Sequence, residues 1–179
     1  MRTKANYFKL GLFVIAGVVL VFAGVIFFSV QALAQKSVYM ETYLDETVQG
    51  LSVGSPVYYR GVQIGRVHHI GFVAADYGLG FRSPGFEKYG QYVRVVMSIE
   101  SMGPGRVAIG QFQEVLQTMI NEGLRTRLKS QALTGVSYLE ADYLDPEYYP
   151  IQELPWKPEY QYIPSAPSSM ATLRRSAEE

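Results

Sequence analysis

The sequence has no cysteine and only two histidines among its 179 residues. A disulfide scaffold, a thiolate metal site, a cysteine nucleophile and a lipid-modified N-terminal cysteine are therefore excluded. The sequence also lacks an excess of charge, with 16 Lys and Arg against 16 Asp and Glu. Nucleic-acid-binding proteins normally carry a basic excess on one face, so the composition argues against that function.

Catalytic and metal-binding patterns are missing as well. His68 and His69 are adjacent, so in a strand their side chains point to opposite faces and cannot share a metal ion. No serine lies in a G-x-S-x-G turn, and Gly78 and Gly80 lack the third glycine and the helix of a nucleotide-binding loop. We therefore predict no enzyme activity, no metal and no cofactor.

The sequence does contain one long apolar run. Leu10 to Val30 carries no charged side chain and would form a helix about 31 Å long, the thickness of the hydrocarbon core of a bilayer. Residues 10–31 are therefore predicted to be a transmembrane helix. The alternative is a cleaved signal peptide, because the sequence ALA at residues 32–34 resembles a processing site. However, the run is longer than the roughly 7–15 residues usual in signal peptides.

Charge sets the orientation of this helix. Arg2, Lys4 and Lys9 precede it without any acidic residue, and positively charged flanks stay in the cytoplasm. Residues 1–9 are thus predicted to be cytoplasmic, and the chain after the helix is predicted to be exported.

The exported part has the pattern of a small, mainly β domain. Alternation predicts strands over residues 38–44, 57–73, 92–99 and 136–143. In the first of these, Tyr39, Glu41 and Tyr43 share the face opposite to Val38, Met40 and Leu44. Three glycines within the second predicted strand indicate the tight bends and bulges of a curved sheet.

One segment of the domain changes its period. Apolar residues at i, i+3, i+4, i+7 and i+8 from Phe112 onward predict a short amphipathic helix over residues 112–122. Val115 belongs to its apolar stripe. A loop rich in Gly, Ser and Pro is expected over residues 76–90.

The C-terminal part has a different composition. Residues 144–167 are rich in proline and tyrosine, so they cannot form a central strand or a helix. We expect them to run extended along another surface, such as that of a neighbouring subunit. Residues 168–179 are predicted to begin a helix with an N-cap at Ser168 or Ser169, and we expect this helix to continue beyond Glu179.

Two motifs mark the ends of the β-domain. GLSVGSPVYYRGVQIGRV runs from Gly50 to Val67, and KSQALTGVSYLEADY runs from Lys129 to Tyr143. Placed behind a single N-terminal membrane helix, this pair resembles the MCE domain family and, within it, the MlaD-like bacterial lipid-transport proteins. The resemblance covers residues 38–143.

The resemblance implies a fold and an assembly. The expected fold is a seven-stranded MCE β-barrel with one short helix, and the expected assembly is a homo-oligomeric, hexameric ring around a central hydrophobic pore. The ring would be anchored in the bacterial inner membrane, with the barrel in the periplasm. It would work with an ABC permease and ATPase, and with a periplasmic or outer-membrane lipid acceptor, to move phospholipid between the two membranes.

The resemblance also implies roles for particular residues. The loop that lines the pore in the family corresponds here to Ala132, Leu133 and Thr134. The glycine-rich motif is expected to shape the barrel without contacting lipid, through Gly50, Gly54, Pro56, Gly61 and Gly65.

Two other functions remain open at this point. A membrane-tethered periplasmic β-domain would bind a protein partner without forming a lipid conduit, and its oligomeric state would separate it from a ring. An anchored hydrolase outside the cytoplasm is disfavoured because the sequence lacks a catalytic pattern.

Overall fold

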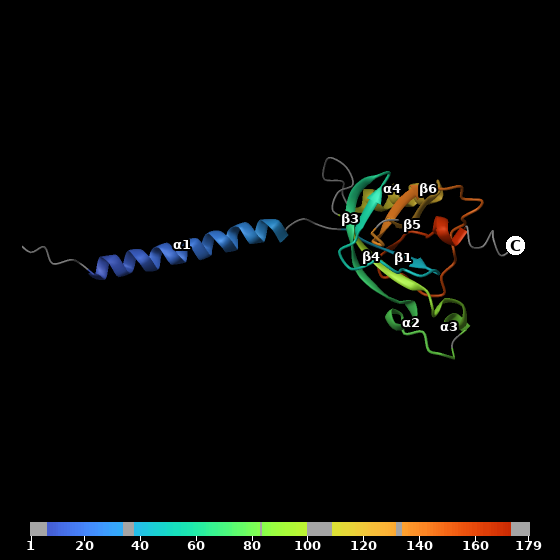
Figure 1. Ribbon diagram of the computed structural model, residues 1–179, viewed down its shortest axis with the longest axis horizontal. Helices are drawn as coiled ribbons and strands as arrows, with labels where there is room; N and C mark the ends of the chain where they lie inside the picture. Colours follow the sequence, from blue (N-terminus) through green and yellow to red (C-terminus); the bar gives the residue numbers. More distant parts are fainter. Residues whose placement is uncertain (1–6, 34–37, 83, 100–108, 132–133, 173–179) are drawn as a thin grey trace, which may run out of the picture. The chain divides into compact units, whose positions relative to one another are not determined.

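The chain divides into two compact units, Met1–Lys36 and Ser37–Glu179. The first unit holds an apolar helix, and the second holds seven strands and three short helices among its described residues. Figure 1 shows the computed structural model, which describes residues 7–33, 38–82, 84–99, 109–131 and 134–172.

The first unit contains helix α1 (Tyr7–Leu33). Its stretch from Tyr7 to Gly24 is long and apolar enough to cross a membrane. Its large apolar side chains from Tyr7 to Phe22 are exposed within the chain. An exposed apolar surface of this length needs a cover in water, so α1 is consistent with the single-pass membrane anchor that the sequence predicts.

The second unit is built on one curled, mixed sheet of seven strands in the order β5-β6-β2-β3-β4-β1-β7 (Figure 1). The pairs β1–β7 and β2–β6 are parallel, and the other neighbours are antiparallel. The strands are β1 (Val38–Leu44), β2 (Pro56–Tyr59), β3 (Val62–Phe72), β4 (Val93–Ile99), β5 (Leu124–Ser130), β6 (Ser137–Tyr143) and β7 (Gln161–Tyr162). This half-barrel confirms the predicted mainly β, seven-stranded fold.

The chain that follows β7 connects the two edges of the sheet. Thr126 of β5 forms a parallel bridge with Ser165. The Thr126 amide donates to the Pro164 carbonyl at 2.9 Å, and the Ala166 amide donates to the Thr126 carbonyl at 2.8 Å. The Thr126 hydroxyl lies 2.6 Å from that of Thr42 of β1 in the interior. The segment after β7 therefore satisfies backbone groups that an open edge would leave unpaired.

Two β-bulges lie in the sheet, in the glycine-containing region where the sequence indicates them. The β2–β3 pairing shifts register between Val57 and Tyr58. The β3–β4 pairing shifts between Val67 and His69. An extra residue on one strand bends that strand and increases its twist, so the two bulges help the sheet to curl.

The hydrophobic core fills the interior of the half-barrel and is covered by α4 (Ile109–Asn121), which packs on β5. Leu116 and Ile120 of α4 are buried in this core, so the predicted amphipathic helix forms. Val115, a member of the predicted stripe, is instead exposed. The fully buried core residues from the strands include Met40, Val57, Val95 and Leu139.

Two further short helices lie at or near the region predicted as a loop over residues 76–90: α2 (Val73–Asp76) overlaps it only at Asp76, and α3 (Pro84–Tyr89) lies within it. They lie side by side at one end of the sheet (Figure 1). Pro84 is the first residue of α3, where its fixed φ suits a helix and its missing N–H costs nothing. The proline that suggested a loop therefore begins a helix.

Strand β1 is buried on both faces. Met40 and Leu44 enter the hydrophobic core, as the alternation predicts. Glu41 and Tyr43 point to the opposite face, and both are buried as well. That second face is covered by Tyr77, which follows α2, and by aromatic residues from beyond Tyr143.

We call residues 144–167 the strap. The strap lies on its own domain, where the Ile163 amide donates to the Glu41 carbonyl at 2.9 Å. Its contact with a neighbouring subunit stays a prediction. The strap contains β7, which is only two residues long. Pro158 and Pro164 stand on either side of β7, and proline cannot donate to a strand ladder, so the pairing stays short.

The end of the strap is fixed by a helix cap. The Ala171 amide donates to the Ser168 hydroxyl at 3.1 Å, the N-cap geometry, and residues 169–172 are helical. The Ser168 amide in turn donates to the Glu46 carboxylate at 2.9 Å, next to β1. Of the two candidate caps, Ser168 is the one used.

Candidate functional site

The loop between β5 and β6 carries the residues that the sequence assigned to a pore. The two strands pair up to Ser130 and Ser137, so the loop is a hairpin tip of residues 131–136. Ala132 and Leu133 lie outside the described residues. Thr134 is exposed, and its hydroxyl donates to the Gln131 side-chain oxygen at 3.1 Å.

The described part of this loop is a tight turn. The Gly135 amide donates to the Gln131 carbonyl at 3.0 Å, and the Gln131 amide donates to the Val136 carbonyl at 2.9 Å. Gly135 has a φ of 69°, which suits glycine. Val136 is 48% exposed, an apolar side chain presented to the surroundings at the tip.

The residues of the glycine-rich motif lie at turns and close approaches of the backbone. Gly50 and Gly54 have positive φ in the turn between β1 and β2, and Pro56 begins β2. Gly61 has a φ of 83° in the β2–β3 turn. Gly65 is in β3, where an added Cβ would overlap the Ser98 carbonyl of β4. Each of these four glycines thus has a backbone reason for its residue type: a positive φ at Gly50, Gly54 and Gly61, and a close carbonyl at Gly65.

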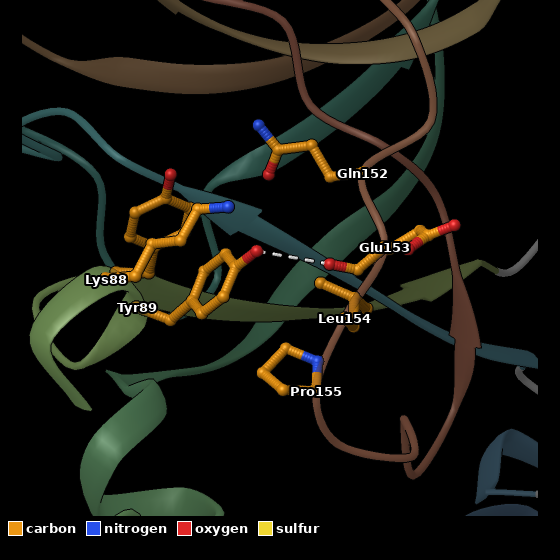
Figure 2. Close-up of a pocket in the computed structure, with 7 residues that line it drawn as sticks. Lys88, Tyr89, Gln152, Glu153, Leu154 and Pro155 are labelled. Atoms are coloured by element: carbon orange, nitrogen blue, oxygen red, sulfur yellow. Dashed lines mark hydrogen bonds between the residues drawn. The ribbon is translucent and has the colours of Figure 1, made fainter. Parts of the chain in front are cut away.

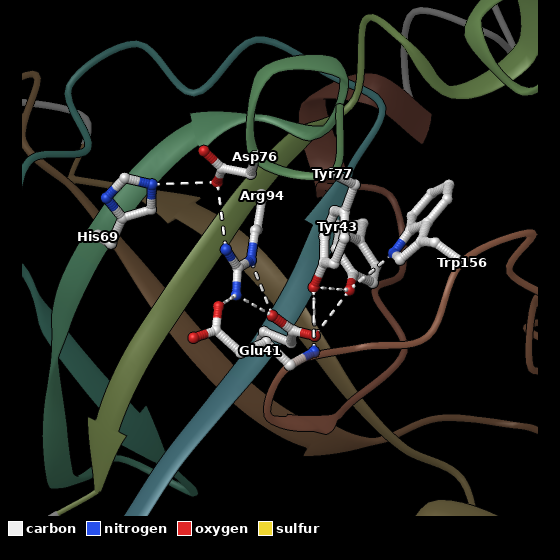
Figure 3. A network of polar contacts seen from close by, with 8 residues as sticks. Glu41, Tyr43, His69, Asp76, Tyr77, Arg94 and Trp156 are labelled. Atoms are coloured by element: carbon white, nitrogen blue, oxygen red, sulfur yellow. Dashed lines mark hydrogen bonds and ion pairs between the residues drawn. The ribbon is translucent and has the colours of Figure 1, made fainter. Parts of the chain in front are cut away.

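A charged and aromatic network covers the second face of β1, and the sequence analysis did not identify it (Figure 3). Glu41 of β1 is fully buried, and Arg94 of β4 is 6% exposed. Arg94 Nε donates to Glu41 Oε2 at 2.8 Å, and Arg94 Nη2 lies 2.6 Å from the same oxygen. A buried carboxylate requires a charged or hydrogen-bonding partner, and Arg94 provides both.

Two tyrosines bind the other oxygen of Glu41. The Tyr43 and Tyr77 hydroxyls each donate to Glu41 Oε1 at 2.8 Å. The Trp156 indole of the strap donates to the Tyr43 hydroxyl at 3.0 Å. Burial is the main cause that raises the pKa of Tyr43 and of Tyr77 above the usual value. Both phenols therefore remain neutral donors at physiological pH.

Arg94 also bonds to acids nearer the surface. Its Nη2 donates to Glu159 Oε2 of the strap at 2.7 Å, and its Nη1 lies 3.4 Å from Asp76 Oδ2, which is 3.1 Å from His69 Nε2. Burial opposes the charge of Arg94, but hydrogen bonds to Glu159 and Glu41 outweigh it and raise the pKa of Arg94. The hydrogen bond from Arg94 lowers the pKa of Glu159.

We call this cluster the Arg94 network, and it joins β1, β4, the α2 region and the strap. Its polar atoms are engaged with one another, and no described residue in it forms a nucleophile–base pair. Across the parts of the chain that the structure describes, no group of three or more His, Asp or Glu side chains is placed to hold a metal ion. We therefore interpret the network as the attachment of the strap to the sheet.

A weak sequence signal for this network existed. Glu41 and Arg94 are each the single charged residue in their strand. Strand alternation places Glu41 on a separate face from the core, but it does not reveal that the strap covers that face.

A half-open pocket of about 380 Å³ lies between α3 and the strap (Figure 2). The Tyr89 hydroxyl donates to the Glu153 carbonyl at 3.2 Å across it. The Lys88 ammonium lies 4.9 Å from the centre of the Tyr89 ring. One wall of the pocket is thus the backbone of the strap, held in place by α3.

Comparison with known proteins places the chain in a family. The family model described as MlaD protein matches residues 36–143. No curated protein matches the chain significantly. Among solved structures, the chain is similar to one described as "Acinetobacter MlaFEDB complex in ATP-bound Vtrans1 conformation". The sequence identity is 15%, the match covers 98% of this chain and 99% of that chain, and the TM-score is 0.46.

The family match covers more than half of the 179 residues and contains both motifs, while the whole strap, including β7, lies beyond its end at Tyr143. The match confirms the predicted resemblance, and with it the prediction that the chain is not an enzyme. The chain therefore belongs to the MlaD protein family.

Proposed function

We propose that the chain is the membrane-anchored subunit of an ABC-type phospholipid transport system. Six copies would form a ring whose central hydrophobic pore passes lipid between the inner and outer membranes. The observation that carries the proposal is the MlaD family match over residues 36–143, directly behind a helix able to span a bilayer. The partners would be a permease and an ATPase in the inner membrane, and a lipid acceptor in the periplasm or outer membrane.

The proposed topology follows from α1. The helix would anchor the chain in the inner membrane with residues 1–9 in the cytoplasm, because Arg2, Lys4 and Lys9 precede it. The β-domain would then stand in the periplasm, between donor and acceptor.

The chemistry of the cargo explains why a conduit is needed. A diacyl phospholipid has on the order of 30 methylenes, and exposing each to water costs about 0.8 kcal/mol. A lipid that crosses an aqueous gap without a cover therefore meets a barrier of about 20 kcal/mol or more. Continuous shielding of the tails removes most of this barrier.

The packing of the domain supports a conduit between copies instead of within one copy. The interior of the half-barrel is filled by its own side chains, and Met40, Val57, Leu116 and Leu139 are all fully buried. Small barrels of about eight strands have interiors that side chains fill, so no space remains for acyl chains. A ring repeats the same apolar loop around a shared axis and creates the space outside the subunits.

We assign the lipid-contacting role to the β5–β6 loop, with Ala132, Leu133 and Thr134 facing the pore. The exposure of Val136 at the same tip supports an apolar loop that is not used by the fold of its own subunit. The glycine-rich motif retains its proposed role in shaping the barrel.

The experiment is a comparison of Leu133→Asp with Ile151→Asp in the full-length protein. Ile151 is an exposed apolar residue of the strap, so its variant introduces the same charge away from the loop. We expect Leu133→Asp to keep the ring mass by native mass spectrometry but to lose bound phospholipid and outer-membrane integrity in cells. Ile151→Asp should retain all three properties.

Two results would contradict the proposal. If Leu133→Asp retained bound lipid and membrane integrity, the assignment of the loop would be wrong. If the wild-type protein were monomeric in mild detergent, the tethered β-domain that binds a protein partner would replace the conduit.

A further inference from the structure

The turn after β1 and the β5–β6 loop are joined by hydrogen bonds through Ser137. The Ser137 amide donates to the Gly50 carbonyl at 2.9 Å, and the Ser137 hydroxyl donates to the Gln49 carbonyl at 2.8 Å. Because a hydroxyl has one proton, Ser137 then accepts from the Ser130 hydroxyl, 2.8 Å away. Ser137 is fully buried, so these bonds are protected from water.

Gly50 also lies so close to the loop that a side chain at this position would not fit. A Cβ added at Gly50 would overlap the Gly135 carbonyl oxygen and would lie 3.0 Å from the Ser137 hydroxyl. The Gly135 backbone is not free to move away, because its amide is bonded to the Gln131 carbonyl and its φ is 69°. The backbone of Gly50 thus directly supports the tip of the loop.

Two other glycines of the same motif provide a contrast. Gly54 and Gly61 have positive φ like Gly50, but an added Cβ at either would meet no described atom within 4 Å. Their requirement for glycine is conformational only. Gly50 alone among these three combines the conformational requirement with contact to the β5–β6 loop.

We propose that Gly50 is a positioning residue for the β5–β6 loop, acting together with Ser137. The contact sets where Gln131 and the stretch 134–136 lie relative to the sheet, and so where the loop meets the lipid. The part of this inference that concerns lipid rests on the proposed function. It gives one glycine of the motif a role in transport beyond shaping the barrel.

The test compares Gly50→Ala with Gly54→Ala in the full-length, detergent-solubilised protein. Both alanines must adopt a positive φ, so both should lower the melting temperature. Only Gly50→Ala should speed hydrogen exchange at the amides of Gln131 and Ser137. Only Gly50→Ala should reduce photocross-linking of the loop by a phosphatidylethanolamine with a photoreactive acyl chain.

If Gly50→Ala does not fold, Ser137→Ala replaces it, with Ser52→Ala as the matched control. Among the described residues, Ser52 bonds only to Ser55, within its own turn. Ser137→Ala should again speed exchange in the loop and lower cross-linking, whereas Ser52→Ala should leave both unchanged.

The two proposals fail in distinguishable ways. Equal exchange and equal cross-linking in Gly50→Ala and Gly54→Ala would overturn the positioning role. If Leu133→Asp leaves cross-linking and bound lipid intact, the lipid-contacting role of the loop is wrong, and the positioning role toward lipid is overturned with it. Faster exchange with reduced cross-linking in Gly50→Ala alone supports both.

Discussion

At Arg94, one guanidinium holds three segments that are distant in sequence. It binds the fully buried Glu41 of β1, Asp76 of α2 and the strap residue Glu159. These three partners differ greatly in exposure, because Glu159 is 57% exposed and Glu41 is not exposed at all. The stability that Arg94 contributes should therefore come mainly from Glu41, whose charge has no access to water.

Arg94→Met should strongly destabilise the domain. It leaves the Glu41 carboxylate buried without its cation, and breaking a buried pair in this way costs about 3–5 kcal/mol. Glu159→Gln is the control, because an exposed partner is screened by solvent and its loss should change stability little. Chemical denaturation of both variants measures the difference. Equal stability of Arg94→Met and the wild type would show that Glu41 does not depend on Arg94.

We expect the stability of the domain to fall at alkaline pH because of Tyr162. Burial raises the pKa of Tyr162 to about 12. Because this value lies above the unfolded value of about 10, the stabilising contribution of neutral Tyr162 is complete below pH 10 and is lost as the pH rises through about 12. The free energy of unfolding should therefore fall over this range.

In Tyr162→Phe this decrease with pH should be shallower, because the titrating group is removed. Tyr148→Phe, at an exposed position of the strap, should follow the wild-type curve. Denaturation at pH 8, 10, 11 and 12 compares the three proteins. An identical pH profile for Tyr162→Phe and the wild type would contradict the assigned pKa shift.

For single residues, the sequence predicts the structural position of some well and of others poorly. Gly61 was predicted to bend one strand over residues 57–73. It instead lies in a turn that divides this stretch into β2 and β3, where its φ is positive. Glu41 could not be placed in a network, because Arg94 and Tyr77, which bond to it, and Trp156, which bonds to Tyr43, come from three distant segments. Strand alternation gives the face of a side chain but not what covers that face.

Among the elements, the strap contributes to the core although it lies entirely beyond the family match. Ile163 is 3% exposed and packs in the core cluster beside β1 and β5. Residues just beyond it complete the bridge to Thr126. The strap is therefore part of the folding unit and not an attached tail.

Ile163→Ala should destabilise the domain by about 2–5 kcal/mol, the range for removing a large aliphatic side chain from a packed core. Ile151→Ala removes the same atoms from an exposed position of the strap and should have little effect. Thermal or chemical unfolding of the two variants provides the comparison. Similar stabilities would mean that the strap does not share the core of the domain.

Sequence patterns predict the elements unequally for physical reasons. The strands β1 and β4 have strong alternation, and α4 has a helical stripe, so their positions agree closely with prediction. β5 was not predicted, because its basic residues obscure the alternation: Arg125 is buried and bonded to the Tyr149 carbonyl of the strap, which sequence alone does not show. β7 was not predicted because the pairing of two residues leaves no pattern.

For the whole molecule, we propose that lipid moves through a space shared between copies. One subunit has a packed interior and an apolar anchor helix, and neither feature provides a path for acyl chains by itself. The fold and the family could be predicted because two motifs and one apolar run lie in recognisable order. The assembly depends on contacts between copies, which the pattern of a single chain does not encode.

The most direct test is native mass spectrometry of the full-length protein released from detergent, with identification of the lipid that it carries. We expect a six-fold multiple of the 20.1 kDa chain with bound phospholipid. We also expect this lipid to be lost from the ring of the Leu133→Asp variant. A monomer, or a ring that retains the same lipid after Leu133→Asp, would contradict the proposed conduit.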